Sequence, residues 1–303
     1  MFHHLLVPLD GSPAAEAVLP LTATLALRLQ AQVSLLHVLD SAGSPARQEP
    51  ARLLYPEDAQ SYLASLARSP LFQGAAVRVH VHGSPDPEVA ASILWHADEW
   101  GADLVLLATQ RGHWLRRVVG GGVARRVLRQ GHTPLLVVRP TRPAGAPPAT
   151  CRTILVALAA SDDYEPAISI ATELAETLSA SVCFLHAVPT PATAPCPTGW
   201  YLPLTMQALI QREAEQAVAV LDEVEAGCRA RGIWARSDVR RGAPTRVLEE
   251  AVQTLRADLL VMSTRRPSLR DAFRGPGCFT PQLLDALGPP LLLLRADPEG
   301  PSG

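Results

Sequence analysis

Short apolar runs alternate with longer segments of helical period along the first half of the chain. Several runs, such as LVLLA and LLVV, are apolar at every position, which is typical of strands covered by helices on both faces. The predicted strands are Leu5–Leu9, Val33–Val38, Val77–Val81, Leu104–Ala108 and Leu135–Val138. The predicted helices lie between them, near residues 13–30, 57–69, 86–100 and 121–131. This alternation indicates an α/β domain with a parallel, doubly wound sheet.

The first predicted helix has a clear start and an interruption. Ser12 followed by Pro13 is a favourable N-terminus, because the hydroxyl can cap free backbone N–H groups and proline needs no N–H at the first helical position. Pro20 falls inside the same helix and removes a backbone hydrogen bond, so we expect a kink there.

The second half of the chain repeats the pattern of the first. HLLVPLDGSPAAEAVLPL from His4 aligns with TILVALAASDDYEPAISI from Thr153 at an offset of 149 residues, and the offset is 155 where Gly101 aligns with Arg256. The repeat predicts two tandem domains. They span residues 1–140 and 151–297, with a Pro/Ala-rich linker at 141–150 and a tail at 298–303.

Composition narrows the function classes. The 303 residues are 48% hydrophobic and 18% charged with a formal net charge of −2, so the chain has the composition of a packed protein without an electrostatic signal for nucleic acid. All 27 basic residues are arginine, which excludes a GxxxxGK[ST] phosphate-binding loop and Schiff-base enzymes. No GxSxG, HExxH or Cys–His signature specifies a catalytic nucleophile.

Cysteine usage and hydropathy bear on the compartment. The 5 cysteines include no CxxC and are odd in number, which argues against a disulfide framework and a zinc ribbon. No apolar run approaches the roughly 20 residues of a membrane helix, and the N-terminal residues are not typical of a signal peptide. We expect a cytoplasmic protein with no membrane partner.

Ligands of doubly wound sheets bind at the carboxyl ends of the strands, where the strand order reverses. Asp10 follows the first predicted strand in the segment PLDGS, where its carboxylate could accept hydrogen bonds from ribose hydroxyls or bind a metal through water. Aspartate before Gly-Ser is also an ordinary turn residue. The spacing alone leaves both interpretations open.

A glycine run follows the fourth predicted strand. Gly120–Gly122 open an amphipathic helix, so backbone N–H groups and the helix N-terminus could bind an anion there. Arg111, Arg116 and Arg117 precede the run and could contact phosphates. The structural alternative is a glycine-rich turn with solvated arginines. The segment does not match GxGxxG, because Arg125 occupies the last glycine position.

Both halves resemble the universal stress protein family. The resemblance rests on LLVPLDGSPAAE and VSLLHV at the first two strands and on ADLVLLATQRGHWLRRVVGGGVARRVLRQGHTPLLVV at the end of the repeat. It implies a five-stranded parallel sheet of order 3-2-1-4-5 in each half. In ATP-binding members it also implies an aspartate closing the first strand and G-x2-G-x9-G-[ST] after the fourth. Members of the family pair their last strands antiparallel across a dimer, which implies an intramolecular pseudo-dimer of the two halves here and leaves a homodimer open.

The resemblance places adenine-nucleotide contacts in the first repeat, with Asp10 on the ribose, Val38 beside the adenine, and the backbone from Gly121 around the phosphates. The full implied set is Pro8, Leu9, Asp10, Val38, Leu107, Ala108, Arg111, Gly112, Gly121, Gly122 and Val123.

The first repeat departs from the family motif in three places. Ala108 and Arg111 stand at the first two glycine positions, and Gly122 replaces the usual serine or threonine. An Arg111 side chain would face the phosphates unless Gly112 takes that role through a shift of one residue.

The second repeat departs further. Ala159 stands at the position of Asp10, Ser263 and Arg266 stand at the first two glycine positions, and Pro276 interrupts the remaining glycines. We therefore expect a nucleotide in the first repeat only.

Histidines are candidates for other chemistry. His80 and His82 share one face of a predicted strand, as two metal ligands would, but the sequence indicates no third ligand, so no metal site is predicted. His37 and His186 occupy equivalent positions and are expected to be buried, hydrogen-bonded imidazoles.

The resulting hypothesis is a tandem universal stress protein that binds ATP, with or without Mg²⁺, as a stress sensor or adaptor, with weak ATPase activity at most. The alternative is a member that binds no nucleotide and acts as an interaction scaffold. An enzyme that transfers nucleotidyl groups on a related fold would need an SGGxDS-type loop, which the sequence lacks.

Overall fold

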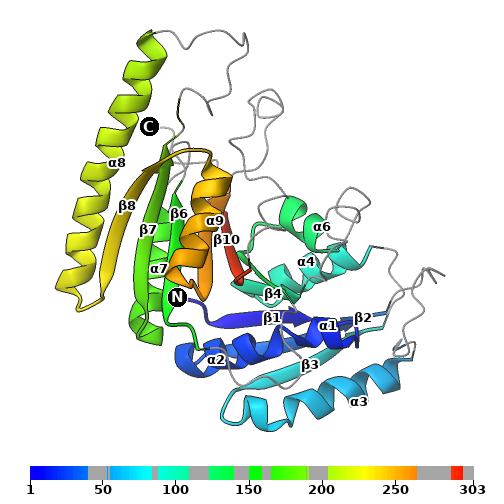
Figure 1. Ribbon diagram of the computed structural model, residues 1–303. Helices are drawn as coiled ribbons and strands as arrows, with labels where there is room; N and C mark the ends of the chain where they lie inside the picture. The colour runs from blue at the N-terminus through cyan, green and yellow to red at the C-terminus, as the bar shows by residue number, and fades with distance from the viewer. Residues whose placement is uncertain are drawn as a thin grey trace. The chain divides into compact units, whose positions relative to one another are not determined.

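The computed structural model divides the chain into two compact units, Met1–Thr150 and Cys151–Gly303 (Figure 1). The residues that it describes are 1–39, 53, 55–83, 88–108, 123–139, 150–158, 165–188, 190, 204–264 and 288–295. Within this part of the chain, no helix combines the length and the apolar character needed to cross a membrane.

The first unit contains a parallel sheet. Its strands are β1 (His4–Pro8), β2 (Gln32–Val38), β3 (Val77–His82), β4 (Leu104–Ala108) and β5 (Leu135–Val138). They lie in the order β3-β2-β1-β4-β5, with every neighbouring pair parallel. The order implied by the family resemblance is confirmed, and each strand boundary falls within one residue of its prediction.

Helices connect these strands. They are α1 (Pro13–Glu16), α2 (Leu19–Leu29), α3 (Pro56–Ala67), α4 (Val89–Glu99) and α6 (Val123–Gln130), with a short 3-10 helix at Pro70–Phe72. Helix α3 packs on β2 and β3, whereas α4 packs on β2 and against α6. Strands β1, β2, β4 and β5 are largely apolar and buried, whereas the edge strand β3 alternates apolar and polar residues and is partly exposed.

The helix predicted for residues 13–30 is two helices, so the expected kink is a complete break. Ser12 caps α1, because its Oγ accepts a hydrogen bond from Ala15 N at 3.1 Å. The chain turns at Ala17 and Val18, and Pro20 stands in the first turn of α2. Proline has no N–H to donate to the carbonyl of Glu16, and its first-turn position needs none.

The second unit repeats this topology. Its strands are β6 (Thr153–Leu158), β7 (Ser181–Val188), β8 (Ala235–Arg241), β9 (Leu259–Thr264) and β10 (Leu291–Arg295). Its helices are α7 (Glu165–Leu178), α8 (Leu204–Ala230) and α9 (Pro244–Leu255). The strand order β8-β7-β6-β9-β10 is again third, second, first, fourth and fifth within the repeat, with parallel neighbours.

An aspartate clamps the first strand in both units. Asp103 accepts hydrogen bonds from the backbone N–H groups of His3 and His4 at 2.7 and 2.9 Å. The equivalent Asp258 accepts from Arg152 and Thr153 at 2.8 and 3.1 Å. Because the first strand would otherwise begin with unsatisfied donors, this aspartate has the same structural function in each repeat.

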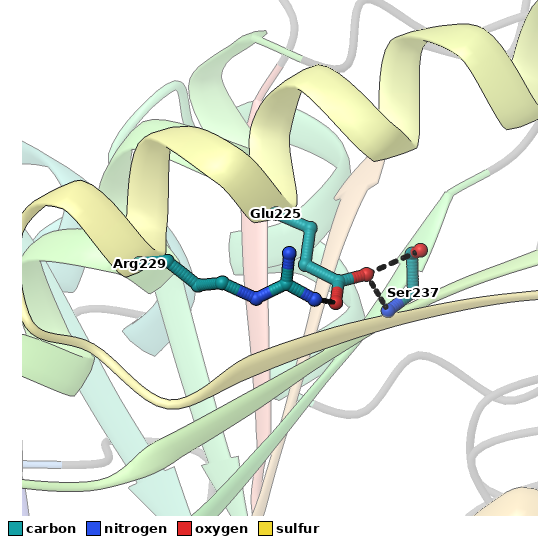
Figure 2. A network of polar contacts seen from close by, with 3 residues as sticks. All are labelled: Glu225, Arg229 and Ser237. Carbon is teal, nitrogen blue, oxygen red and sulfur yellow. Dashed lines mark hydrogen bonds and ion pairs between the residues drawn. The ribbon is translucent and has the colours of Figure 1, made fainter.

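Helix α8, the longest helix in the described part of the chain, is tied to the edge strand β8. Glu225 Oε2 accepts hydrogen bonds from both N and Oγ of Ser237, at 2.9 and 2.7 Å, while Oε1 accepts from Arg229 (Figure 2). Helix α8 therefore packs on β7 and β8 of its own sheet, and these polar contacts attach it to β8.

Candidate functional site

The strand order of the first unit reverses direction beside β1. The chain runs from β1 through β2 to β3 on one side and then crosses to β4 on the other side. The carboxyl ends of these strands, at Pro8, Val38 and Ala108, consequently lie along one edge of the sheet. This edge is the switch point at which doubly wound sheets bind ligands.

Asp10 stands at the centre of this edge and forms the turn that leaves β1. Its Oδ1 accepts hydrogen bonds from Ser12 N at 3.0 Å and from Ser12 Oγ at 2.6 Å. Gly11, the residue between them, has a φ of 83°, a conformation that side chains with a Cβ rarely adopt. Asp10 thus performs the turn function that its sequence context predicts, and it is also exposed to solvent.

His37 supports the backbone directly before Asp10. The side chain is 5% exposed, and its Nδ1 lies 2.8 Å from the carbonyl oxygen of Leu9. A carbonyl only accepts, so Nδ1 donates in this hydrogen bond. The prediction of a buried, hydrogen-bonded imidazole is confirmed for His37. The equivalent His186 is 1% exposed.

A hydrogen-bonded pair, Tyr62 and Glu16, lies near Asp10. Tyr62 on α3 donates a hydrogen bond to Glu16 Oε1 on α1 at 3.0 Å. Burial of Tyr62 raises the pKa of its hydroxyl well above the usual value, and the negative charges of Glu16 and Asp10 raise it further. The phenol of Tyr62 is therefore a neutral donor at all physiological pH values, and the negative charge beside it remains on the carboxylates of Glu16 and Asp10.

The other predicted contact residues that the structure describes are either buried or partly exposed. Val38 and Leu107 are 8% and 6% exposed, so each offers an apolar edge to a ligand rather than a whole side chain. Pro8, Ala108 and Val123 are partly exposed. Arg111, Gly112, Gly121 and Gly122 lie outside the described residues, as do Arg116, Arg117 and Gly120.

The second unit has a different chemistry at the corresponding edge. Ser263, at the position of Ala108, is 4% exposed, and its Oγ has no hydrogen-bond partner within the described residues. Ala159, Arg266 and Pro276, on which the predicted loss of the nucleotide site depends, lie outside the described residues.

The structure also brings together three histidines that the sequence did not connect. His96 on α4 packs beside His80 and His82 on β3, and one nitrogen from each ring lies within 4.8 Å of the others. Burial lowers the pKa of His96 to about 4, and also lowers that of His80, with repulsion between the neighbouring imidazoles as the second cause. His80 and His96 are therefore neutral at pH 7.

These features define a duplicated α/β protein in which each unit has a parallel, doubly wound sheet. The model of the universal stress protein family matches residues 1–139 and again residues 150–276. The chain belongs to the universal stress protein family, as a tandem of two domains.

Individual relatives are distant. A universal stress protein of Methanocaldococcus jannaschii is 27% identical over 147 residues, which cover 46% of this chain and 83% of the relative. A universal stress protein of Archaeoglobus fulgidus superposes with a TM-score of 0.65 at 13% identity and covers 96% of both chains. A second protein of that organism, solved in complex with dAMP, is 22% identical with a TM-score of 0.33, over 45% of this chain and 97% of its own.

Proposed function

We propose that this universal stress protein binds an adenine nucleotide, ATP in the first instance, in its N-terminal repeat only, and acts as a nucleotide-dependent stress sensor or adaptor. The observation that supports this proposal is the convergence of the predicted contact residues at the switch point. Pro8, Val38 and Ala108 end three adjacent strands there, and Asp10 projects an exposed carboxylate from the same edge.

Each part of the nucleotide has a chemically suited contact in this proposal. The carboxylate of Asp10 accepts hydrogen bonds from ribose hydroxyls, while Val38 and Leu107 offer apolar edges to the adenine. The backbone from Gly121 to Val123 leads into α6 (Val123–Gln130), whose N-terminus provides the partial positive charge that phosphates require. Mg²⁺, when bound, would offset repulsion between the phosphates and the carboxylates of Asp10 and Glu16.

The asymmetry between the repeats follows from the same residues. Ala159 offers a methyl group in place of the Asp10 carboxylate, so a buried ribose hydroxyl would lose its acceptor there. An unpaired buried hydroxyl costs roughly 1–3 kcal/mol, or about one to two decades of affinity. Pro276 removes a backbone donor where phosphates would bind.

A second candidate function is an interaction scaffold without nucleotide. Arg111 at a glycine position and Gly122 in place of a hydroxyl residue favour it. The Arg111 side chain would stand where backbone N–H groups otherwise approach the phosphates, and Gly122 removes a hydroxyl donor. No detectable binding of ATP to the wild-type chain would support this candidate and overturn the nucleotide proposal.

Calorimetric titration of ATP, with and without Mg²⁺, tests the proposal. We expect one site per chain, weakened at least about tenfold by Asp10→Ala and by Gly121→Val. Asp10→Asn is the sharper variant, because the amide keeps the acceptor for Ser12 N and loses only the charge and the second ribose acceptor. Asp58→Ala, on the exposed surface of α3, removes an equal charge and should leave the affinity unchanged. A stoichiometry of two, or binding indifferent to all changes at Asp10, would contradict the proposal.

We also propose that the two repeats form an intramolecular pseudo-dimer through their last strands. Leu135–Val138 and Leu291–Leu294 are entirely apolar and close the strand order of their units, and an open edge of that kind favours aggregation. Amide hydrogen exchange tests this directly. Pairing protects all backbone N–H groups of Leu135–Val138, whereas an open edge leaves every second one in rapid exchange.

A further inference from the structure

Strand alternation places two histidines side by side at the carboxyl end of β3. His80 and His82 are separated by one residue, so both side chains project from the same face of the sheet. Their parallel register partners on β2 are Leu36 and Val38. β3 is the edge strand of the first unit, which leaves His80 exposed and His82 half-buried.

The helix that follows β3 supplies a third imidazole. His96 lies on α4, is 2% exposed, and its Nε2 is 3.1 Å from Nδ1 of His82. The His80 and His96 ring centroids are 4.8 Å apart, and those of His82 and His96 are 5.2 Å apart, with each pair arranged edge to face.

These distances suit a tetrahedral metal ion. Bonds of about 2.0–2.1 Å from Zn²⁺ to imidazole nitrogen separate two ligand nitrogens by about 3.3 Å. His82 and His96 already have this separation, at 3.1 Å. All three nitrogens lie within 4.8 Å of one another, so the farthest pair must approach by roughly 1.5 Å. The exposed side chain of His80 can make this movement without disturbing the core.

A carboxylate supports the buried ligand. Glu99 Oε2 lies 3.4 Å from Nδ1 of His96, one helical turn along α4. Nδ1 of His96 is buried and has no hydrogen bond of good geometry within the described residues. A metal at Nε2 would fix the proton on Nδ1 and strengthen its attraction to Glu99, which is the usual arrangement behind a metal-bound histidine.

Two tryptophans lie beside the cluster, and one of them, Trp95, is 54% exposed. The ring centroid of Trp100 lies 4.3 Å from that of His96 and 5.0 Å from that of His80, and the centroid of Trp95 lies 4.7 Å from that of His96. Their indole rings supply no metal ligand. The exposed position of His80 leaves the fourth coordination position open to water or to a small anion.

We propose that His80, His82 and His96 form a binding site for one divalent transition-metal ion of borderline softness, with Zn²⁺ as the ion that best fits three imidazole ligands and an open position. The site uses the edge strand of the first unit and none of the proposed nucleotide contacts. It is therefore independent of the proposed nucleotide function.

Zinc titration of the full-length chain, without an affinity tag and after removal of metal with EDTA, tests this site. We expect one Zn²⁺ per chain at the cluster with a Kd of about 1 µM or tighter. His80→Ala and His82→Ala should each weaken binding at least about tenfold. His3→Ala is the matched control, because His3 is exposed and forms hydrogen bonds through its backbone N–H and carbonyl groups. Circular dichroism verifies that each variant folds. Because His80 is exposed, His80→Ala still tests the site if a variant of the buried His96 fails to fold.

Cobalt spectroscopy separates this site from binding by the 5 cysteines. Co²⁺ at the cluster should give the visible absorption of a tetrahedral ion without the near-ultraviolet band of a thiolate ligand. The proposal is overturned by a thiolate band, by Zn²⁺ affinity weaker than about 100 µM, or by affinity that His80→Ala and His82→Ala do not change.

Discussion

Gly101 and Arg256 occupy equivalent positions in the two repeats and share a left-handed backbone conformation, with φ of 63° and 49°. Each follows a helix, α4 or α9, and each is succeeded by the same capping hydrogen bond. Ala102 N donates to Ala97 O at 2.8 Å, and Ala257 N donates to Val252 O at 3.2 Å. The second repeat thus keeps the geometry of the helix cap although Arg256 replaces the glycine that favours it.

Arg256→Gly is expected to stabilise the second unit by about 1 kcal/mol, because it removes the steric cost of a Cβ in the left-handed region. Arg256 is exposed, so the substitution removes little packing. Gly101→Ala is the reciprocal change and should destabilise the first unit by about the same amount. A Cβ at Gly101 would meet nothing within 4 Å, so the cost there comes from the backbone alone. Urea titration measures both, and the same sign for the two changes would contradict this reasoning.

The attachment of α8 to β8 gives a second prediction. Glu225→Ala removes the acceptor for both Ser237 N and Ser237 Oγ and leaves a part-buried backbone donor unpaired. We expect a loss of about 1–3 kcal/mol in the free energy of unfolding of the second unit. Glu225→Gln, which keeps one acceptor oxygen, should lose less. Glu223→Ala, on the exposed surface of the same helix, is the control, and an equal effect at Glu223 would show that the network contributes nothing specific.

Buried thiols give a third prediction. Burial raises the pKa of Cys151 to about 12, with the carboxylate of Asp258 as the second cause, and burial also raises the pKa of Cys183. Both therefore remain neutral thiols at pH 8, and iodoacetamide should modify them only after unfolding. Peptide mass spectrometry after alkylation with and without urea measures this. Modification of the native chain at the rate of the unfolded chain would contradict it.

The raised pKa of Cys151 also predicts how the stability of the folded chain depends on pH. An unfolded cysteine loses its proton near pH 9, whereas folded Cys151 keeps it to about pH 12. The folded chain binds more protons in this window, so its stability falls as the pH rises from 9 toward 12. Cys151→Ala should flatten that part of the curve.

The strands could be predicted from the sequence because each is a short apolar run between breakers, and local pattern alone determines its limits. The sequence predicts a kink at Pro20, whereas the helix breaks completely at Ala17 and Val18, before the proline. The missing N–H of Pro20 can be read from the sequence, but the extent of the break cannot. His96 could not be connected to His80 and His82, because only the packing of α4 on the sheet brings it to β3. Leu36, Val38, His80 and His82 share a face by register, whereas the position of His96 depends on how α4 packs.

The candidate nucleotide site could be predicted only in part for the same reason. Val38 ends β2 and Asp10 follows the end of β1, so their place at the switch point follows from strand order. The contributions of Arg111, Gly112, Gly121 and Gly122 depend on a segment outside the described residues, and their contacts remain predictions from the family motif.

Photolabelling with an azido derivative of ATP tests the location of the nucleotide most directly. After irradiation of the native chain and proteolysis, the label should fall on peptides from the first repeat that contain Val38 or the segment after Ala108. Excess ATP should abolish this labelling, and Asp10→Asn should reduce it. Labelling of the second repeat near Ala159 or Ser263, in preference to or equally with the first, would contradict the proposal that only the N-terminal repeat binds nucleotide.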